Sequence, residues 1–224
     1  MQARDYRLNL WQEFMKHTPY IIQKDQETMG EIAGLYVENS GFLYQVYEAF
    51  IEKDRFLEDE QNEVAYERDG DDYILTLRGR ECVYSEQEFR RILVSMLDLL
   101  EEPLPLGTVV DLKKSVYQNL PEIQQVDEIR MVITHRFLGS EEDSCYFPYA
   151  GVVYPTGMMG RKEVLYFTRP IIEKIVHMGY RDEKEDAYTY LMKKELVIEK
   201  GKNSIGFAPK EEIEAFNQRF RKGE

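Results

Sequence analysis

The sequence predicts an α+β fold in which N-terminal helices with a β-hairpin precede a compact antiparallel β-meander or small barrel with flanking helices. Before residue 103, several stretches have apolar residues at helical spacing. Pro103 and Pro105 then end the last of these helices, because proline cannot continue a helix and disfavours helix in the preceding residue. Beyond them come short runs rich in Val, Ile, Tyr and Phe, which favour strands. We therefore divide the chain into an acidic helical and hairpin segment, residues 1–103, and a β-rich domain, residues 104–224.

Three helices are predicted in the first segment, at residues 6–17, 41–53 and 85–102. The third begins with Ser85 and Glu88 in the register of a capping box. The residues expected to face the core are Leu8, Trp11, Phe14 and Met15 in the first helix, Leu43, Val46, Tyr47, Phe50 and Ile51 in the second, and Phe89, Ile92, Leu93, Met96, Leu97 and Leu100 in the third.

A β-hairpin is predicted over residues 63–79. Two alternating apolar runs flank Asp69 and Gly70 there, and glycine permits the positive φ that a tight hairpin turn requires. The first segment therefore combines helices with one hairpin.

The β-rich domain begins with four predicted antiparallel strands, at residues 107–114, 128–137, 146–155 and 163–168. The glycines and the basic end of residues 156–162 lack the spacing of a phosphate loop, and a strand follows them, so we interpret this stretch as a hairpin turn.

The remainder of the domain is predicted to be mainly helical. Residues 168–180 fit a short helix with Thr168 as its cap, Pro170 in its first turn and Gly179 at its end. The other predicted elements are a helix at residues 181–196, a hairpin at residues 196–208 and a closing helix at residues 209–220.

The net charge of −13 is unevenly distributed. Residues 1–105 hold 23 Asp and Glu against 11 Lys and Arg, whereas the remaining residues hold 19 against 18. Such acidity argues against binding to a phosphate backbone, which needs clustered Lys and Arg, so no nucleic-acid partner is expected. The acidic run at residues 52–63 is either a site for a basic protein partner or the solvated end of a helix.

Localisation follows from what the sequence does not contain. No apolar run approaches the roughly 18 residues that a membrane-spanning helix needs, and charged residues interrupt the first twenty. Cys82 and Cys145 form neither a metal-binding pair nor a disulfide framework, so we expect reduced thiols. The sequence predicts a cytoplasmic protein without a membrane partner.

The sequence contains no recognised catalytic or metal-binding motif. His17, His135 and His177 lack close metal-ligand spacing, and the paired acids are not organised by a calcium loop, so neither metal nor cofactor is expected. Cys145 with His135 or His177 would be the only candidate for a nucleophile and base. A small buried thiol explains Cys145 as well. An enzyme using Cys145 or a converging acid cluster remains the alternative class.

Four blocks in a fixed order carry a family resemblance. These are LPLGTVVDLK, RMVITHR, YAGVVYPTG and VLYFTRPIIEKIVHMGY, within residues 104–185. Together they resemble a family of unknown function from Gram-positive bacteria, domain of unknown function 4176, commonly encoded beside LXG toxins of the type VII secretion system. Pro148 stands before Tyr149 where the family often has Asp, so no role is carried over for that acid. The resemblance implies an accessory protein of toxin loci and supplies no catalytic residues.

Tyrosines on neighbouring predicted strands suit a binding surface, because tyrosine combines a large apolar area with a polar tip. We therefore expect non-catalytic protein binding, as a cytosolic chaperone or targeting adaptor for an LXG-type toxin. The expected partner is a secreted toxin or its helical targeting proteins. An immunity protein that neutralises the toxin domain is the alternative, and a structural subunit that associates through a strand edge is another. The candidate partner-binding residues are Tyr149, Val153, Asp54, Glu58, Asp59 and Glu60.

Overall fold

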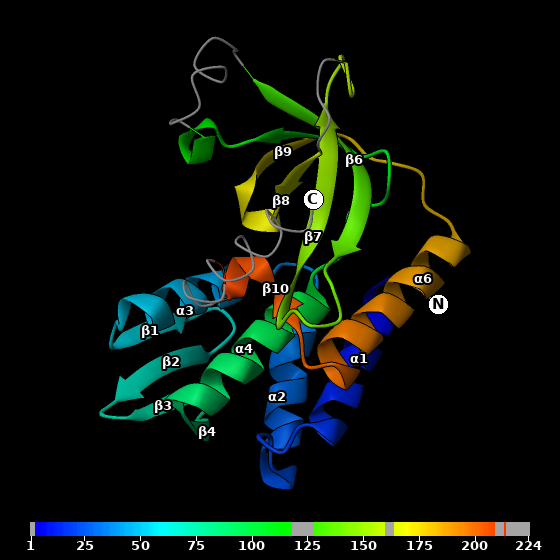
Figure 1. Ribbon diagram of the computed structural model, residues 1–224. Helices are drawn as coiled ribbons and strands as arrows, with labels where there is room; N and C mark the ends of the chain where they lie inside the picture. Colours follow the sequence, from blue (N-terminus) through cyan, green and yellow to red (C-terminus); the bar gives the residue numbers. More distant parts are fainter. Residues whose placement is uncertain (1–2, 118–127, 160–163, 209–212, 214–224) are drawn as a thin grey trace. The chain divides into compact units, whose positions relative to one another are not determined.

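The computed structural model describes residues 3–117, 128–159, 164–208 and 213, and the fold is α+β (Figure 1). The chain divides into two compact units, which are described in turn. The first unit is Met1–Glu102 with Lys193–Lys200, and the second is Pro103–Met192 with Gly201–Glu224. Within the described residues, no helix is both long enough and apolar enough to cross a membrane.

The three helices predicted in the first unit are present, and a fourth accompanies them. Glu88 and Ser85 form the predicted capping box at the start of the third. Ile51 was expected to be buried but is 50% exposed, at the edge of its helix's apolar face. The additional helix was missed because it contains Gly30 and Gly34 and buries several small or polar residues. The helices are α1 (Ala3–His17), α2 (Gln23–Tyr36), α3 (Gly41–Glu52) and α4 (Glu86–Leu100).

The predicted hairpin forms the centre of a four-stranded antiparallel sheet, in which the strands follow chain order. Gly70 turns the hairpin with φ +62°, as the sequence predicted. The interpretation of residues 52–63 as a solvated helix end is wrong, because α3 stops at Glu52 and an edge strand follows. The strands are β1 (Phe56–Asp59), β2 (Val64–Asp69), β3 (Asp72–Leu77) and β4 (Arg80–Ser85).

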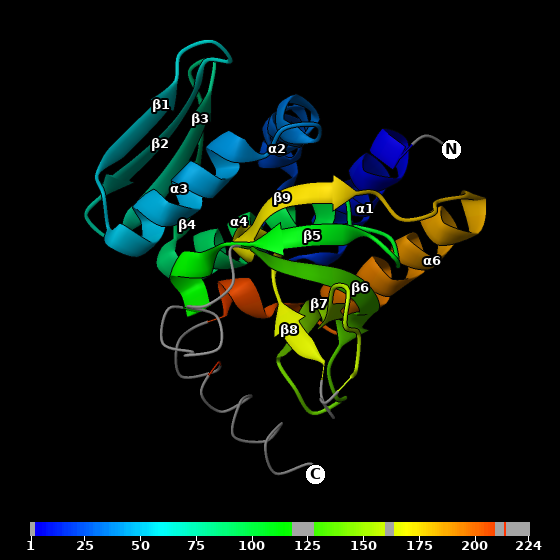
Figure 2. The ribbon, with the colours of Figure 1, turned by 90° about the horizontal axis from the view of Figure 1, so that it is seen from above.

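Aromatic side chains join this sheet to its helices. The Phe89 ring of α4 lies between 5.4 and 5.5 Å from the rings of Phe50 in α3, Tyr66 in β2 and Tyr73 in β3, measured between centroids. Figure 2 shows α3 and α4 on one side of the sheet. Each such contact removes apolar area from water, so the helices hold one face of the sheet buried.

Two buried cations satisfy carbonyl groups near the C-terminal end of α4. Arg7 donates to the carbonyls of Leu100 and Val37, at 2.9 and 2.6 Å. Lys193, which is fully enclosed, donates to the carbonyls of Asp98 and Glu101. The last turn of a helix has carbonyls without partners inside the helix, and both side chains supply hydrogen-bond donors to them. Burial lowers the pKa of Lys193 to about 8.

The second unit contains the predicted meander, and its described strands form an open sheet rather than a closed barrel. All four strands predicted between residues 107 and 168 are present. The order is β10-β7-β6-β5-β9, and β8 also pairs with β7. The core includes Leu104, Val110, Met131, Tyr149 and Phe167. The strands are β5 (Val109–Leu112), β6 (Ile129–Leu138), β7 (Cys145–Val153), β8 (Leu165–Phe167), β9 (Ile172–His177) and β10 (Asn203–Ser204).

The short helix predicted at residues 168–180 is wrong. One turn of 3₁₀-helix, η2 (Arg169–Ile171), leads into the edge strand β9. The pairing of β9 with β5 shifts register twice, passing over Glu173 and Val176. Each extra residue reverses the alternation of faces, so Ile172 and Ile175 both pack on the core although they are three residues apart. Two bulges thus produced an apolar spacing that resembles a helix.

Toward the C-terminus, the predicted helix is α6 (Glu183–Lys193), and it continues into the π-helix η3 (Lys194–Glu199). The hairpin expected at residues 196–208 is wrong. Its apolar start remains helical, and β10 pairs in parallel with β7; a short apolar run fits either type of element. The closing helix predicted at residues 209–220 lies outside the described residues except for Ile213, as do residues 160–163 of the predicted turn. Two further 3₁₀ turns are η1 (Lys114–Tyr117) and η4 (Ile205–Phe207).

Candidate protein-binding surface

The most distinctive exposed surface of the first unit is the face of the four-stranded sheet that points away from the helices. Along β3, Tyr73, Leu75 and Leu77 are buried, whereas the residues between them are not. Because successive side chains of a strand point to opposite faces, the strand register assigns every residue to one face. We call the outward set the acidic sheet face: Phe56, Glu58, Ala65, Glu67, Asp69, Asp72, Ile74, Thr76, Glu81, Val83 and Ser85.

An apolar row crosses the middle of this face. The register aligns Phe56 with Glu67, Glu67 with Ile74, and Ile74 with Val83, one residue from each strand. Phe56 is 55% exposed and Val83 is 49% exposed. Large apolar side chains left in water on one face of a sheet favour contact with another apolar surface.

Carboxylates lie on both sides of the apolar row. One neighbouring row contains Asp69 and Asp72, and the other begins with Glu58 and ends with Glu81. With Glu67 in the middle row, the face carries five carboxylates. None of the five forms an ion pair with another residue in the described part of the chain.

The basic residues of the same strands point elsewhere. Arg80 forms an ion pair with Glu31 of α2 at 2.8 Å, on the helix side. Arg68 is aligned with the buried Tyr73 and therefore also lies on the helix side. The four strands thus contribute acids and no cations to the outer face, which makes it electrostatically complementary to a cationic partner.

The four acidic residues predicted to bind a partner do not all lie on the acidic sheet face. Glu58 lies on the acidic sheet face. Asp59 points to the helix side and accepts hydrogen bonds from Asn62 and Tyr36, at 2.8 and 2.7 Å, and these bonds lower its pKa. Asp54 and Glu60 are exposed and flank β1 without belonging to it. Alternation of apolar and polar residues in β1 and β4 is the sequence signal that could have predicted the other residues of this face.

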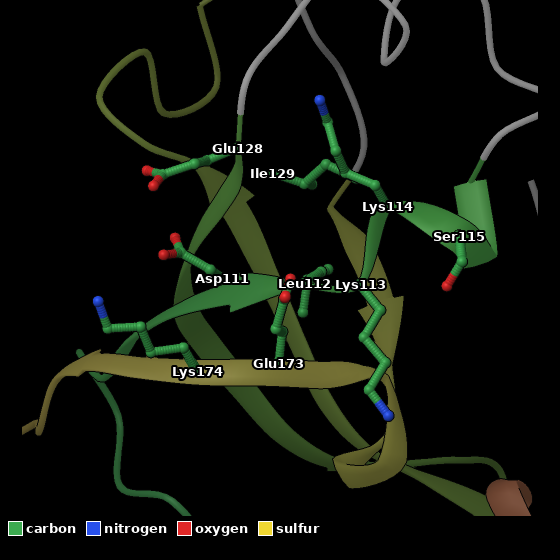
Figure 3. Close-up of a pocket in the computed structure, with 9 residues that line it drawn as sticks. All are labelled: Asp111, Leu112, Lys113, Lys114, Ser115, Glu128, Ile129, Glu173 and Lys174. Carbon is green, nitrogen blue, oxygen red and sulfur yellow. The ribbon is translucent and has the colours of Figure 1, made fainter.

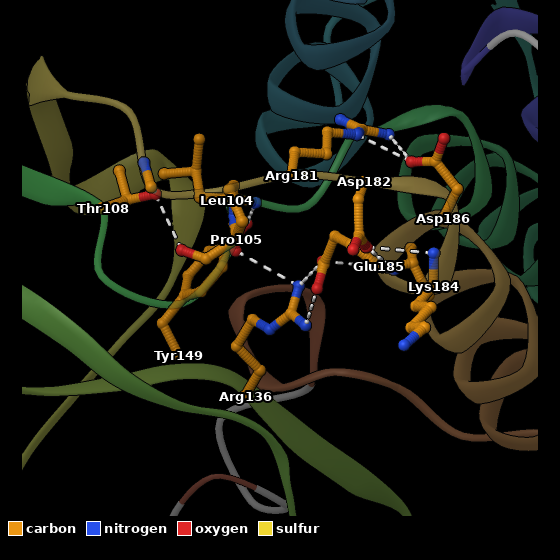
Figure 4. Close-up of polar contacts among 12 residues, drawn as sticks. Leu104, Pro105, Thr108, Arg136, Tyr149, Arg181, Asp182, Lys184, Glu185 and Asp186 are labelled. Atoms are coloured by element: carbon orange, nitrogen blue, oxygen red, sulfur yellow. Dashed lines mark hydrogen bonds and ion pairs between the residues drawn. The ribbon is translucent and has the colours of Figure 1, made fainter.

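Tyr149 and Val153 do not provide an exposed surface. Tyr149 is 2% exposed, stacks on Phe167 at 5.7 Å and accepts a hydrogen bond from the Leu104 amide at 3.1 Å (Figure 4). Val153 packs against the same core. The half-exposed tyrosine in this stretch is Tyr154, which follows Val153 directly. Periodicity alone does not say which face of a strand the core occupies.

A buried ion pair ties α6 to the sheet of the second unit (Figure 4). Arg136 of β6 binds Glu185 of α6 through its two terminal guanidinium nitrogens, Nη1 and Nη2, and Nη1 also donates to the Leu104 carbonyl. Its guanidinium lies over the rings of Phe137 and Tyr188, at 5.6 and 5.5 Å from their centroids. The Glu185 carboxylate neutralises the buried charge and fixes α6 to the sheet, although Arg136 Nε itself has no hydrogen-bond partner in the described part of the chain.

The second unit also has an open cavity of about 610 Å³ beside β5 and β9. Figure 3 shows acidic and basic side chains around it. Asp111 is held by Arg130 at 2.8 Å and is therefore already neutralised. Three acids and three lysines line the cavity, so it favours ions of neither sign: Asp111, Glu128, Glu173, Lys113, Lys114 and Lys174.

The cysteine candidate lies in a small hydrophobic cluster. Cys145 is 1% exposed and packs against Ile205, and neither it nor Cys82 forms a disulfide. Burial raises the pKa of Cys82 to about 11. His135 contacts the Thr134 hydroxyl at 2.9 Å. In the described part of the chain, no group of three or more His, Cys, Asp or Glu is arranged to hold a metal ion.

Comparison with known proteins gives one match. Residues 103–188 match the family model described as domain of unknown function (DUF4176). The matched stretch begins with the second unit and lies within it. It supports the resemblance seen in the four sequence blocks as similarity to an uncharacterised domain family. No curated protein and no solved structure matches the chain.

Proposed function

We propose that this protein is a non-catalytic, protein-binding accessory factor of a bacterial type VII toxin system, a cytosolic chaperone or targeting adaptor for an LXG-type toxin. The acidic sheet face is the observation that carries the binding role. The similarity of residues 103–188 to an uncharacterised domain family supports the toxin context, through the resemblance of that family to accessory proteins of toxin loci.

The surface suits binding for two physical reasons. Five carboxylates that form no ion pair within the described residues create a negative field that accelerates encounter with a cationic protein. The apolar row of Phe56, Ile74 and Val83 lies between them and supplies area whose burial contributes affinity. Charge thus governs the rate of association, and the apolar row governs the lifetime of the complex.

Co-expression with an LXG toxin encoded beside this protein tests the proposal. The N-terminal helical domain and the C-terminal toxic domain should be expressed separately, each with the tagged full-length protein. Co-purification with the helical domain is expected for a chaperone or adaptor, and co-purification with the toxic domain indicates the immunity role. Failure of both domains to co-purify would contradict the proposed function.

A further inference from the structure

We propose that the acidic sheet face receives an amphipathic, cationic α-helix of a partner protein, lying across the strands with its apolar side on Phe56, Ile74 and Val83. This inference rests on the proposed function and specifies the kind of segment that is bound. The reasoning uses the spacing of the rows, the backbone of the occupant and the sign of the charges.

The first argument is the dimensions of the face. From β1 to β4 the apolar row spans three strand spacings, about 14 Å, which corresponds to about nine residues of helix. Apolar residues at positions i, i+7 and i+10 or i+11 of a helix would therefore lie over Phe56, Ile74 and Val83, and position i+3 or i+4 would lie over Glu67.

The second argument is the separation of the carboxylates. Successive rows on one face are two residues apart, about 7 Å, so Glu58 and Glu81 lie about 14 Å from the row of Asp69 and Asp72. A helix with its side chains is about 10–12 Å wide and fits between the two acidic rows. Lys or Arg on both of its flanks would then reach a carboxylate.

The third argument excludes other occupants. An extended segment laid on the face would leave its own amides and carbonyls unpaired, because a sheet face presents side chains only; a helix satisfies these groups internally. A second copy bound through the same face would place carboxylates against carboxylates, which is unfavourable. A cationic helix meets neither cost.

The test uses the full-length protein and two synthetic peptides of equal length and composition, both made of Leu, Lys and Ala. One peptide places Leu in a single helical stripe with Lys on both flanks, and the other is scrambled so that no stripe forms. Calorimetric titration is expected to show at least tenfold tighter binding of the striped peptide, because only that peptide buries the apolar row. Equal affinity for the two peptides would overturn the inference.

Matched variants locate the binding site. Phe56→Ser with Val83→Ser should weaken binding of the striped peptide at least tenfold, whereas Ile51→Ser, an equally exposed apolar residue of α3, should change it less than twofold. Glu58→Gln with Glu81→Gln should weaken it about fivefold, compared with less than twofold for Glu48→Gln with Glu52→Gln, which removes the same charge from α3. Equal effects of variant and control would mean non-specific attraction and would sink the proposal.

Amide NMR shifts provide the final measurement. A helix across the strands should shift Phe56, Ile74 and Val83 together, whereas shifts confined to β1 or β4 would indicate strand addition at an edge and would overturn the inference. Circular dichroism of each variant confirms that it is folded. If the toxin co-purifies but the striped peptide does not bind the face, the helix inference fails and the proposed function stands. The reverse result retains the helix site and removes the toxin as its partner.

Discussion

The ion pair of Arg136 and Glu185 shows how strongly a single residue can affect the stability of the second unit. The Arg136 side chain is almost fully enclosed, so its charge depends on partners inside the unit. Glu185→Ala would leave this guanidinium without its carboxylate, and we expect a loss of about 3–5 kcal/mol in the free energy of unfolding. Urea denaturation measures the loss. Glu183→Ala, an exposed acid of the same helix, is the control and should change stability by less than about 0.5 kcal/mol.

Lys193 makes the stability of the first unit depend on pH. Its folded-state pKa of about 8 lies below the usual value of 10.5, mainly because of burial. Between these values the unfolded chain binds more protons than the folded chain, so this residue makes stability rise with pH, by up to about 1.4 kcal/mol per pH unit. Urea unfolding at intervals between pH 8 and about 9.5 measures the slope, below the range in which tyrosines ionise. Lys193→Met should remove this contribution, and an unchanged slope would contradict the assignment.

The two cysteines give a residue-scale test of the enzyme alternative. Both thiols are buried, and a thiol reacts as the thiolate, which burial disfavours. Labelling of the native protein by a disulfide reagent should be far slower than labelling of the urea-unfolded chain. Rapid reaction of Cys145 in the native protein would instead support a nucleophilic role. Cys145→Ser identifies which thiol contributes any fast phase.

At the scale of elements, the pairing of β6 with β7 depends on the absence of one side chain. A Cβ at Gly151 would lie 2.3 Å from the Val132 carbonyl oxygen, and backbone cannot yield to it easily. Gly151→Ala should therefore cost about 2 kcal/mol or more, as substitutions that force a backbone shift do. Gly34→Ala in α2 meets no atom within 4 Å and should stabilise by about 0.5–1 kcal/mol. Thermal unfolding should move in opposite directions for the two variants.

Local sequence patterns predicted some of the helices, turns and strands and missed others. The capping box of Ser85 and Glu88 and the hairpin at Gly70 were predictable, because neighbouring residues alone determine them. The strand β9 was not, because its two bulges exist only in its pairing with β5. The sheet strands β1 and β4 were missed for a related reason. The place of each is decided by pairing with the hairpin beside it.

At the scale of the whole molecule, charge asymmetry predicts how binding responds to salt. The carboxylates of the acidic sheet face contribute to the net negative charge of the first half of the chain. Salt screens the attraction between such a face and a cationic partner. The association rate with the proposed toxin partner should therefore fall between about 0.05 M and 0.5 M salt, while dissociation, which we expect apolar contacts to govern, should change less. Stopped-flow measurements separate the two rates. Association that is equally fast in both buffers would exclude electrostatic steering.

The division of the chain into residues 1–103 and 104–224 stays a prediction as far as independent domains are concerned. The structure adds that Lys193–Lys200, far along the sequence, belongs to the first unit. Arg91 of α4 donates to the Val197 carbonyl at 2.8 Å, and Lys194 forms an ion pair with Glu13 of α1 at 3.1 Å. Local sequence patterns do not predict contacts between residues more than a hundred positions apart, so these contacts could not be predicted from the sequence.

The sequence by itself determined the fold class, most helices, the central hairpin, the four strands of the meander and the acidic character of the first half. All of these follow from periodicity, turn chemistry or composition, which neighbouring residues specify. Tertiary structure alone decided that Tyr149 lies inside, that Phe56, Ile74 and Val83 meet on one face, and that five acids surround them. The physical reason is that a strand's alternation defines two faces, and only packing against helices and register with other strands decide which face is buried.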